Sequence, residues 1–325
     1  MPSKHKHINE SRLKTIYLRQ DAPSWGMDYQ PSILATPQEA PSIPHALILT
    51  PKKLGGREVH TLSTPEVNAA LLGLYHPRTV GLQEQRMLSP EPRHHPLWTF
   101  PGIDRTELPP LKGIIDVAER LGYLDLLAHV SVKNEHECNG SLTVVFPWVG
   151  DLLWTVQSPS GEVFNINWTV KAGYSDFKRP SPEKKSKTDD MRSVLGRHEI
   201  EKIYYEDASI RTVQVADEGI DRNVSDNLRQ LQLHHRRQLQ MTEEQRQEML
   251  FKYRSALDAG VPPVEVILQF TERGKFSVYQ CRSFFYQAIW NRELRIDLFH
   301  PILINLPQRQ ETRDVIDVYA DWFKG

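Results

Sequence analysis

Two segments decide the fold, Asp151-Leu-Leu-Trp-Thr-Val-Gln157 and Val163-Phe-Asn-Ile-Asn-Trp-Thr-Val-Lys171. Side chains alternate between the two faces of a strand, and both segments place apolar residues at every second position. The stretch between them, Ser158-Pro-Ser-Gly-Glu162, is typical of a turn. We therefore expect an antiparallel hairpin with an apolar face that includes Trp154 and Trp168, and with a polar opposite face.

The register of this hairpin determines which polar side chains meet. A three-residue loop, Ser160-Gly161-Glu162, keeps the polar faces of both strands on one side and uses the left-handed conformation that Gly161 tolerates. In that register Asp151 lies directly opposite Lys171. A slip of one residue would put these two side chains on opposite faces of the sheet.

Further strands and helices flank the hairpin. The helix expected from about residue 64 has start signals in Ser63, Thr64 and Pro65. The other expected strands are 46–50, 79–88, 142–146 and 210–215, and the other expected helices are 111–127 and 191–205. This mixture predicts an α/β domain over residues 1–219, with a mixed sheet flanked by helices.

The composition changes near Asp217, and the rest of the chain is expected to be mainly helical. Expected helices cover about 224–240, the stretch after Thr242, 263–271, 277–290 and 311–323. Residues 294–298 and 302–306 resemble a short hairpin. Helices followed by a hairpin predict a winged-helix-like second domain over residues 220–325.

Charge and composition exclude several classes of protein. Forty basic and 41 acidic residues give a formal charge of -1, so bulk positive charge cannot hold this chain on nucleic acid. Any contact with DNA must be local, and the first 26 residues predict a basic arm. Two distant cysteines, Cys138 and Cys281, argue against a disulfide scaffold, and no apolar run is long enough for a membrane span. We expect a cytoplasmic protein that makes no use of a membrane.

Three side chains form a pattern that is typical of nucleases. Glu66 lies on an expected helix, Asp151 on a strand, and Lys171 on the neighbouring strand. Carboxylates bind hard divalent cations such as Mg²⁺, which neutralise the attacked phosphate and help to deprotonate water. A lysine beside them orients the water and stabilises the developing negative charge.

Each of the three residues also has a purely structural interpretation. Glu66 stands three positions after Ser63 and could complete a capping box at the start of the helix. Asp151 could simply open a strand, and Lys171 could be an ordinary solvated strand end.

Four motifs carry a resemblance to a known family. They are Trp25-Gly-Met-Asp-Tyr-Gln-Pro31, Gly56-Arg-Glu-Val-His-Thr-Leu-Ser-Thr-Pro-Glu66-Val, Gln83-Glu-Gln85, and Gly150-Asp151-Leu with Trp168-Thr-Val-Lys171. In order and spacing, the chain from about residue 25 to 220 resembles the TnsA-type endonuclease subunit of heteromeric transposases. The resemblance continues more loosely to the end of the sequence.

The resemblance implies a fold, an activity and a set of partners. The fold is like that of type II restriction endonucleases, and the cofactor is Mg²⁺, for which Mn²⁺ can substitute. The enzyme cuts the 5′ ends of the transposon, while a TnsB-type DDE transposase cuts and joins the 3′ ends. The C-terminal domain docks a TnsC-type AAA+ ATPase, with DNA alongside. Such a protein is bacterial and cytoplasmic, and associates with the nucleoid when the machine assembles.

The resemblance also implies roles for individual residues. Glu66 and Asp151 correspond to the metal-binding acids, and Lys171 to the catalytic lysine. The family has an acid or amide two positions before this lysine, where the present sequence has Thr169. A hydroxyl is a poorer ligand, so Asn167 or the carbonyl of Val170 could complete the metal site instead.

The remaining candidates are accessory or bind DNA. Gln85 is expected either to approach the site from its strand or, with equal weight, to lie on an exposed strand face. A basic run can neutralise DNA phosphates without reading bases, although it could equally be a solvated loop. Its members are Lys178, Arg179, Lys184 and Lys185.

Two other functions stay open beside the transposase subunit. One is a stand-alone restriction or repair nuclease of the same fold. The other is a noncatalytic scaffold that links transposase and ATPase to DNA, with a site eroded at Thr169.

Overall fold

The computed structural model describes residues 8–22, 24–133, 140–178 and 187–325, and the chain divides into two compact units. The first unit comprises Met1–Ala70, Arg78–Gly219 and Trp322–Gly325, and the second Leu71–Pro77 and Ile220–Asp321. The two units differ in two segments from the domains that the sequence predicted, 1–219 and 220–325. Residues 71–77 belong to the second unit, and residues 322–325 belong to the first.

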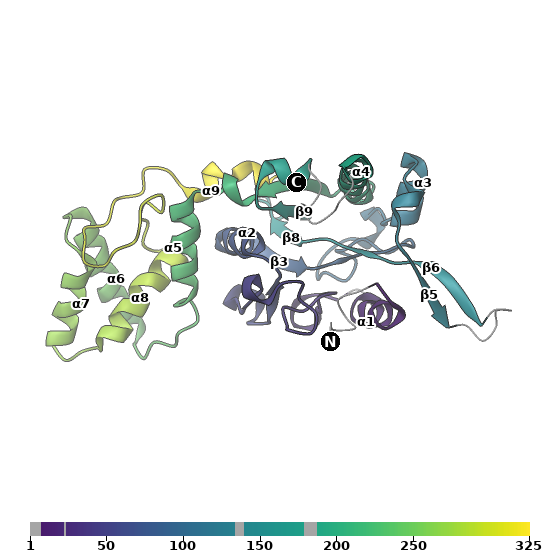
Figure 1. The fold of residues 1–325 in the computed structure, drawn as a ribbon. Helices are drawn as coiled ribbons and strands as arrows, with labels where there is room; N and C mark the ends of the chain where they lie inside the picture. Colours follow the sequence, from purple (N-terminus) through teal and green to yellow (C-terminus); the bar gives the residue numbers. More distant parts are fainter. Residues whose placement is uncertain (1–7, 23, 134–139, 179–186) are drawn as a thin grey trace. The chain divides into compact units, whose positions relative to one another are not determined.

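A four-stranded sheet organises the first unit (Figure 1). Its strands are β3 (Thr79–Glu84), β8 (Leu152–Gln157), β9 (Val163–Lys171) and β10 (Arg211–Ala216), in the order β10-β9-β8-β3. β10 runs parallel to β9, whereas β8 is antiparallel to both β9 and β3. The predicted mixed α/β class is therefore confirmed.

The hairpin of β8 and β9 has the predicted faces but a different register. Leu152 pairs with Trp168 and Trp154 with Ile166, on the apolar face. The loop spans Ser158 to Glu162, so the centre of the hairpin lies one residue earlier than expected. Each residue of β8 consequently meets a partner two positions earlier, and the predicted pairing of Asp151 with Lys171 is wrong. Because the partners shift by two residues, each side chain stays on the face of the sheet that was predicted for it.

Both faces of this hairpin are buried. Helix α4 (Lys187–Glu206) covers the face that carries Leu153, and its residues Ile200 and Tyr204 join Leu153 in one apolar cluster. Helix α3 (Ile114–Leu121) contacts α4 and contributes to the same cluster. On the other face, Trp168 donates from Nε1 to the carbonyl of Trp322. The last residues of the sequence thus cover the apolar face of β9.

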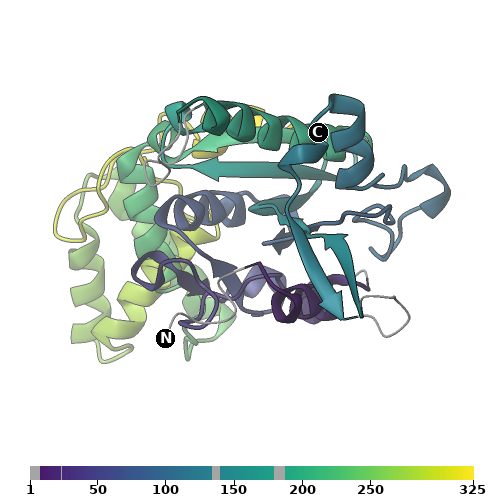
Figure 2. The same ribbon diagram turned by 45° about the vertical axis from the view of Figure 1, so that its right-hand side comes forward.

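Three two-stranded sheets complete the first unit. β1 (Leu47–Leu49) pairs with β2 (Val59–Thr61), β4 (Met87–Leu88) with β7 (Trp148–Val149), and β5 (His129–Lys133) with β6 (Ser141–Val145). The ribbon of β5 and β6 projects away from the four-stranded sheet (Figure 2). A single strand was expected over 79–88, but it is broken after Glu84 because Gln85 has a left-handed backbone with φ of 48°.

The expected basic arm at the start of the chain is wrong for the described residues. Residues Glu10–Gln20 form helix α1, which packs Leu13 and Ile16 against β5. Arg19 is paired with Glu39, and Lys14 with Glu10. Leucine and isoleucine three positions apart give this basic segment an apolar side, which binds it to the fold.

The second unit is mainly helical. Its helices include α5 (Arg222–Gln232), α6 (Glu243–Asp258), α7 (Pro263–Glu272), α8 (Val278–Trp290) and α9 (Val315–Val318), and the end of α2 (Thr64–Tyr75) belongs to it. A capping box of Thr242 and Gln245 starts α6, the helix expected after Thr242. Cys281 is a buried free thiol, while Cys138 lies outside the described residues.

The predicted hairpin of 294–298 and 302–306 is wrong. Residues 291–314 are all described, and they contain turns and one isolated bridge between Ile296 and Gln310, without a strand pair. Pro301 and Pro307 lack the backbone donors that a ladder needs. The Asp297 side chain also accepts from the backbone N–H of Phe299, which favours a turn. In the described parts of the chain, no helix has the length and apolarity that crossing a bilayer requires.

Candidate active site

Glu66, Gln85 and Asp151 line one open cleft of about 670 Å³ in the first unit. Glu66 lies in the first turn of α2, Gln85 in the turn after β3, and Asp151 directly before β8. Arg197 of α4 lines the same cleft. The fold therefore brings together side chains that are separated by up to 131 positions, as counted from residue 66 to residue 197.

Glu66 makes the contacts of a capping residue while lining the cleft. Its Oε1 accepts from the Ser63 hydroxyl over 2.9 Å, and its Oε2 accepts from the backbone N–H of Leu62 over 2.9 Å. The Glu66 N–H in turn donates to Ser63 Oγ. The structural interpretation and the functional one are thus compatible, because the cap fixes the carboxylate at the cleft.

Gln85 reaches the site, which is one of the two positions expected from the sequence. Its Nε2 donates to Glu66 Oε2 over 2.8 Å, and the side chain is buried. Its backbone N–H donates to the carbonyl of Asp151 over 2.9 Å. One residue therefore ties the helix that carries Glu66 to the strand that carries Asp151.

Asp151 is fixed by the neighbouring strand. Its Oδ2 accepts from the backbone N–H of Val170 over 2.7 Å, so the aspartate meets the strand at Val170 instead of facing Lys171. Its Oδ1 accepts no hydrogen bond from any described residue. Lys171 ends β9, is partly buried, and is close enough to Glu66 for their charges to interact. The three predicted residues thus lie in one electrostatic neighbourhood.

The charge state of Glu66 reflects this neighbourhood. Burial and, next, the charge of Asp151 together raise the pKa of the Glu66 carboxyl from 4.5 to about 7, against the opposing effects of the hydrogen bonds from Leu62 and Ser63 and of the charge of Lys171. Two acids that share a poorly solvated site cannot both ionise easily. A bound cation would relieve this repulsion.

Sequence reasoning missed a third acid, Glu201. It lies on α4, is buried, and accepts from Asn167 Nδ2 and Thr169 Oγ1, each over 3.0 Å. Burial raises the pKa of Glu201, and the charge of Asp151 adds to the effect. The signal was its position beside Ile200 on the apolar side of the helix, where an acid is costly without partners.

Asn167 and Thr169 are therefore engaged in holding Glu201. Neither is among the described residues that line the cleft. A direct role of these two side chains as ligands stays a prediction, and so does the role of the Val170 carbonyl. What the structure describes for Val170 is the hydrogen bond from its N–H to Asp151.

The predicted DNA-binding run lies mostly outside the described residues. Arg179, Lys184 and Lys185 fall in the stretch 179–186, and Lys178 is exposed after the short turn Tyr174–Phe177.

The donor set of the cleft fits a hard divalent cation. Two carboxylates, Glu66 and Asp151, supply oxygen ligands, and Asp151 Oδ1 has an unused lone pair. In the described parts of the chain, no group of three or more His, Cys, Asp or Glu side chains is arranged to hold a metal. The two carboxylates are the kind of ligand that Mg²⁺ usually takes, since it is commonly bound by one or two carboxylates and keeps several waters.

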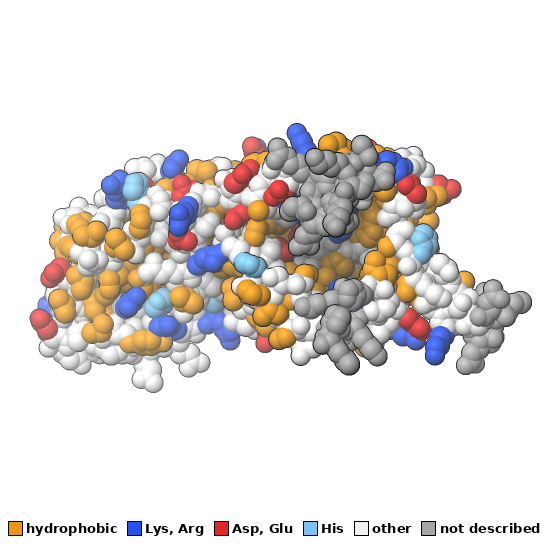
Figure 3. All heavy atoms as spheres, in the orientation of Figure 1, with side chains coloured by type: hydrophobic (Ala, Val, Ile, Leu, Met, Phe, Trp, Pro, Cys, Tyr) orange, Lys and Arg blue, Asp and Glu red, His pale blue; other side chains and the backbone are white. Residues whose placement is uncertain are grey.

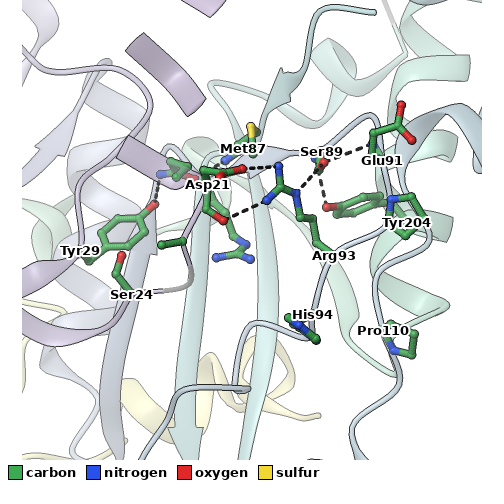
Figure 4. Close-up of a pocket in the computed structure, with 14 residues that line it drawn as sticks. Asp21, Ser24, Tyr29, Met87, Ser89, Glu91, Arg93, His94, Pro110 and Tyr204 are labelled. Atoms are coloured by element: carbon green, nitrogen blue, oxygen red, sulfur yellow. Dashed lines mark hydrogen bonds and ion pairs between the residues drawn. The ribbon is translucent and has the colours of Figure 1, made fainter. Parts of the chain in front are cut away.

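A second cavity, of about 480 Å³, lies at the end of α1 and is drawn in Figure 4. Its most prominent cation is already engaged. Arg93 pairs with the Asp21 carboxylate, donates to the Asp21 carbonyl and contacts the Ser89 hydroxyl (Figure 4). Since Arg93 and Asp21 bond to each other and the cavity lacks a pair of adjoining carboxylates among its described lining residues, we place the candidate chemistry in the cleft of Glu66 and Asp151.

Comparisons with known proteins do not add to this picture. No protein-family model matches the chain, and no curated protein matches it.

Proposed function

We propose that this chain is a metal-dependent DNA endonuclease subunit of a heteromeric transposase, which cuts the 5′ ends of the transposon. The observation that carries the proposal is the shared cleft of Glu66 and Asp151, with the charge of Lys171 acting on Glu66. Two acids and a lysine in one site are the groups that phosphodiester hydrolysis requires.

In this proposal each residue has a defined task. Glu66 and Asp151 would hold Mg²⁺ or Mn²⁺, which when bound neutralises the phosphate and acidifies water. The Val170 N–H holds the Asp151 carboxylate in place. Gln85 holds Glu66 Oε2. Lys171 orients the attacking water and stabilises the negative charge that develops on the phosphate oxygens.

The family that this chain resembles has an acid or amide at the position of Thr169, and Glu201 lies next to this position. The charges of Glu201 and Asp151 interact, and the Thr169 hydroxyl donates to Glu201. In this interpretation the acid that the sequence lacks at position 169 is supplied by α4. This is the reason for preferring an enzyme over a noncatalytic scaffold.

The surface agrees with an enzyme that partners deliver to DNA. On the face shown in Figure 3, basic and acidic side chains are interspersed among apolar ones. With a formal charge of -1, affinity for DNA must come from a local site or from partners. We propose a TnsB-type transposase and a TnsC-type ATPase as these partners, in the bacterial cytoplasm, and a restriction-endonuclease-like fold for the first unit. We further propose that the second unit docks the ATPase.

The test is 5′-strand cutting by the purified assembly. Transposon-end DNA labelled at the 5′ strand is incubated with the partners and Mg²⁺, using wild type, Asp151→Ala and Lys171→Ala. We expect both variants to lose 5′ cutting while 3′ cutting persists. Lys202→Ala is the control, because Lys202 is an exposed lysine of α4 that pairs with Glu206.

Three outcomes would change the proposal. Equal 5′ nicking by wild type and Lys171→Ala would reject the assignment of the site. Efficient cutting without partners would favour a stand-alone nuclease. Unchanged transposition by Asp151→Ala would favour the scaffold.

A further inference from the structure

Arg197 lines the candidate cleft, and its guanidinium makes one aromatic contact and one long hydrogen bond. It lies on α4 and lines the cleft with Glu66 and Asp151. Its guanidinium lies 5.4 Å from the ring centroid of Trp148, an arrangement typical of a cation–π contact. Its Nη2 donates one long hydrogen bond, 3.3 Å, to the carbonyl of Val149. The aromatic ring thus restrains the guanidinium without using up its donors.

Arg192 and Arg93 of the first unit differ in this respect, because each has an acidic partner. Arg192, on the same helix, lies over Tyr123 but also pairs with the Asp125 carboxylate through both terminal nitrogens. Arg93 pairs with Asp21 (Figure 4). Within the described residues Arg197 has no ion pair, and a guanidinium has five N–H donors. Arg197 therefore has donors available for a ligand.

The charges around Arg197 indicate what that ligand is. Burial, together with the charges of Lys171 and Arg197, lowers the pKa of His198 to about 4, while the charge of Asp151 opposes the shift. His198 is consequently neutral at pH 7. Among the described residues that line the cleft, Arg197 is the one lysine or arginine, and it shares the lining with the carboxylates of Glu66 and Asp151. A planar guanidinium binds phosphate oxygens in a two-pronged geometry.

We propose that Arg197, held on Trp148, forms a subsite that binds one backbone phosphodiester of DNA beside the carboxylate pair. This inference deepens the proposed nuclease function and rests on it for the identity of the polymer. The arginine touches the DNA substrate. Trp148 is a positioning residue, because it acts by restraining the guanidinium.

Salt-dependent binding tests the subsite without any cutting. The full chain is titrated into a fluorescent transposon-end duplex in the presence of a chelator, at a series of salt concentrations. Loss of one phosphate contact lowers the slope of log K against log salt by about 0.9. We expect this change for Arg197→Ala, with binding weakened about tenfold or more. Arg197→Lys should retain the slope but bind more weakly than wild type, since it keeps the charge and loses the two-pronged contact.

Arg192→Ala is the matched control, because it removes an arginine of the same helix that already has an acidic partner. Both alanine variants should unfold at the temperature of wild type. Replacing single phosphates by neutral methylphosphonates should weaken binding of wild type at one linkage, and Arg197→Ala should be insensitive to that same replacement.

The proposal is overturned if Arg197→Ala has the affinity and slope of wild type, if Arg192→Ala shows an equal loss, or if wild type does not bind the duplex at the lowest salt. The experiment distinguishes failure of the nuclease proposal from failure of the phosphate subsite. A wild type that never cuts, but whose salt slope falls in Arg197→Ala, would retain the phosphate subsite and reject the hydrolysis.

Discussion

Gln85 donates a hydrogen bond from Nε2 to Oε2 of Glu66 over 2.8 Å, from a backbone with φ of 48°. This conformation is uncommon for a residue with a side chain. It turns the chain between β3 and β4, and the same residue bonds through its N–H to the Asp151 carbonyl. The geometry of the acid pair therefore depends on a residue in an unfavourable backbone conformation.

The two contributions of Gln85 can be separated by substitution. Gln85→Ala should lower the free energy of unfolding by about 1 to 3 kcal/mol, because Glu66 loses a buried donor. Gln85→Gly loses the same side chain but adopts the positive φ easily, so it should be more stable than the alanine variant by about 1 kcal/mol. Urea unfolding measures both values. Equal stabilities of the two variants would show that the backbone at this turn is not strained.

Glu66 should make stability depend on pH. Its pKa is raised from 4.5 to about 7, so the folded chain keeps a proton that the unfolded chain releases above pH 4.5. Stability relative to Glu66→Gln should thus fall as pH rises from about 4.5 to about 7, and stay level above that range. The total difference is about 3 kcal/mol.

Urea midpoints of wild type and Glu66→Gln, measured with a chelator across this pH range, check the expectation. Glu119→Gln is the control, because Glu119 is an exposed glutamate of α3. Parallel curves for wild type and Glu66→Gln would contradict the raised pKa.

Divalent cations should stabilise the fold through the two carboxylates. Binding to the folded chain alone adds about 2.7 kcal/mol when free Mg²⁺ exceeds its Kd a hundredfold. We expect a rise in melting temperature for wild type at pH 7, reversed by chelator. Glu66→Gln and Asp151→Asn should each lose most of the rise, and Glu119→Gln should keep it. An equal rise in all variants would place the cation elsewhere.

Glu201 should contribute strongly to stability through the two hydrogen bonds that it accepts. Glu201→Ala removes the acceptor of the Thr169 hydroxyl and leaves Asn167 Nδ2 with one long bond, 3.4 Å, to the Thr212 hydroxyl, which should cost about 3 kcal/mol. Glu201→Gln keeps one acceptor oxygen and should cost less. Glu199→Ala, which removes an exposed acid that bonds to Tyr123, should change stability by less than about 1 kcal/mol. Urea unfolding of the three variants gives the order of their free energies of unfolding. The reverse order would show that Glu201 does not stabilise the fold through Asn167 and Thr169.

Local patterns allowed the strands to be predicted better than their pairing. The alternation in β8 and β9 identified both faces of the hairpin, since a strand has a fixed period of two. The register depended on the loop conformation, and the five positions from Ser158 to Glu162 admit more than one. The contact of Asp151 with Val170 follows from that register and could not be predicted.

Residues far apart in the chain were predicted less well. Ser63 and Glu66 gave the start of α2 because capping is local. Glu201 was missed because its place on the apolar side of α4 indicates burial only together with its partners, Asn167 and Thr169, which lie on strand β9 more than 30 positions earlier. The hairpin of residues 294–298 and 302–306 was predicted from apolar runs alone. Pro301 and Pro307, which lack the backbone N–H groups that pair strands, were not taken into account.

The last four residues belong to the first unit and cover Trp168 of β9, the strand that ends in Lys171. A ribosome releases residues 220–321 before it releases these four. The strand bearing Lys171 therefore acquires this apolar cover only after the helical unit has emerged, so a nascent chain that lacks residues 322–325 would leave Trp168 without it.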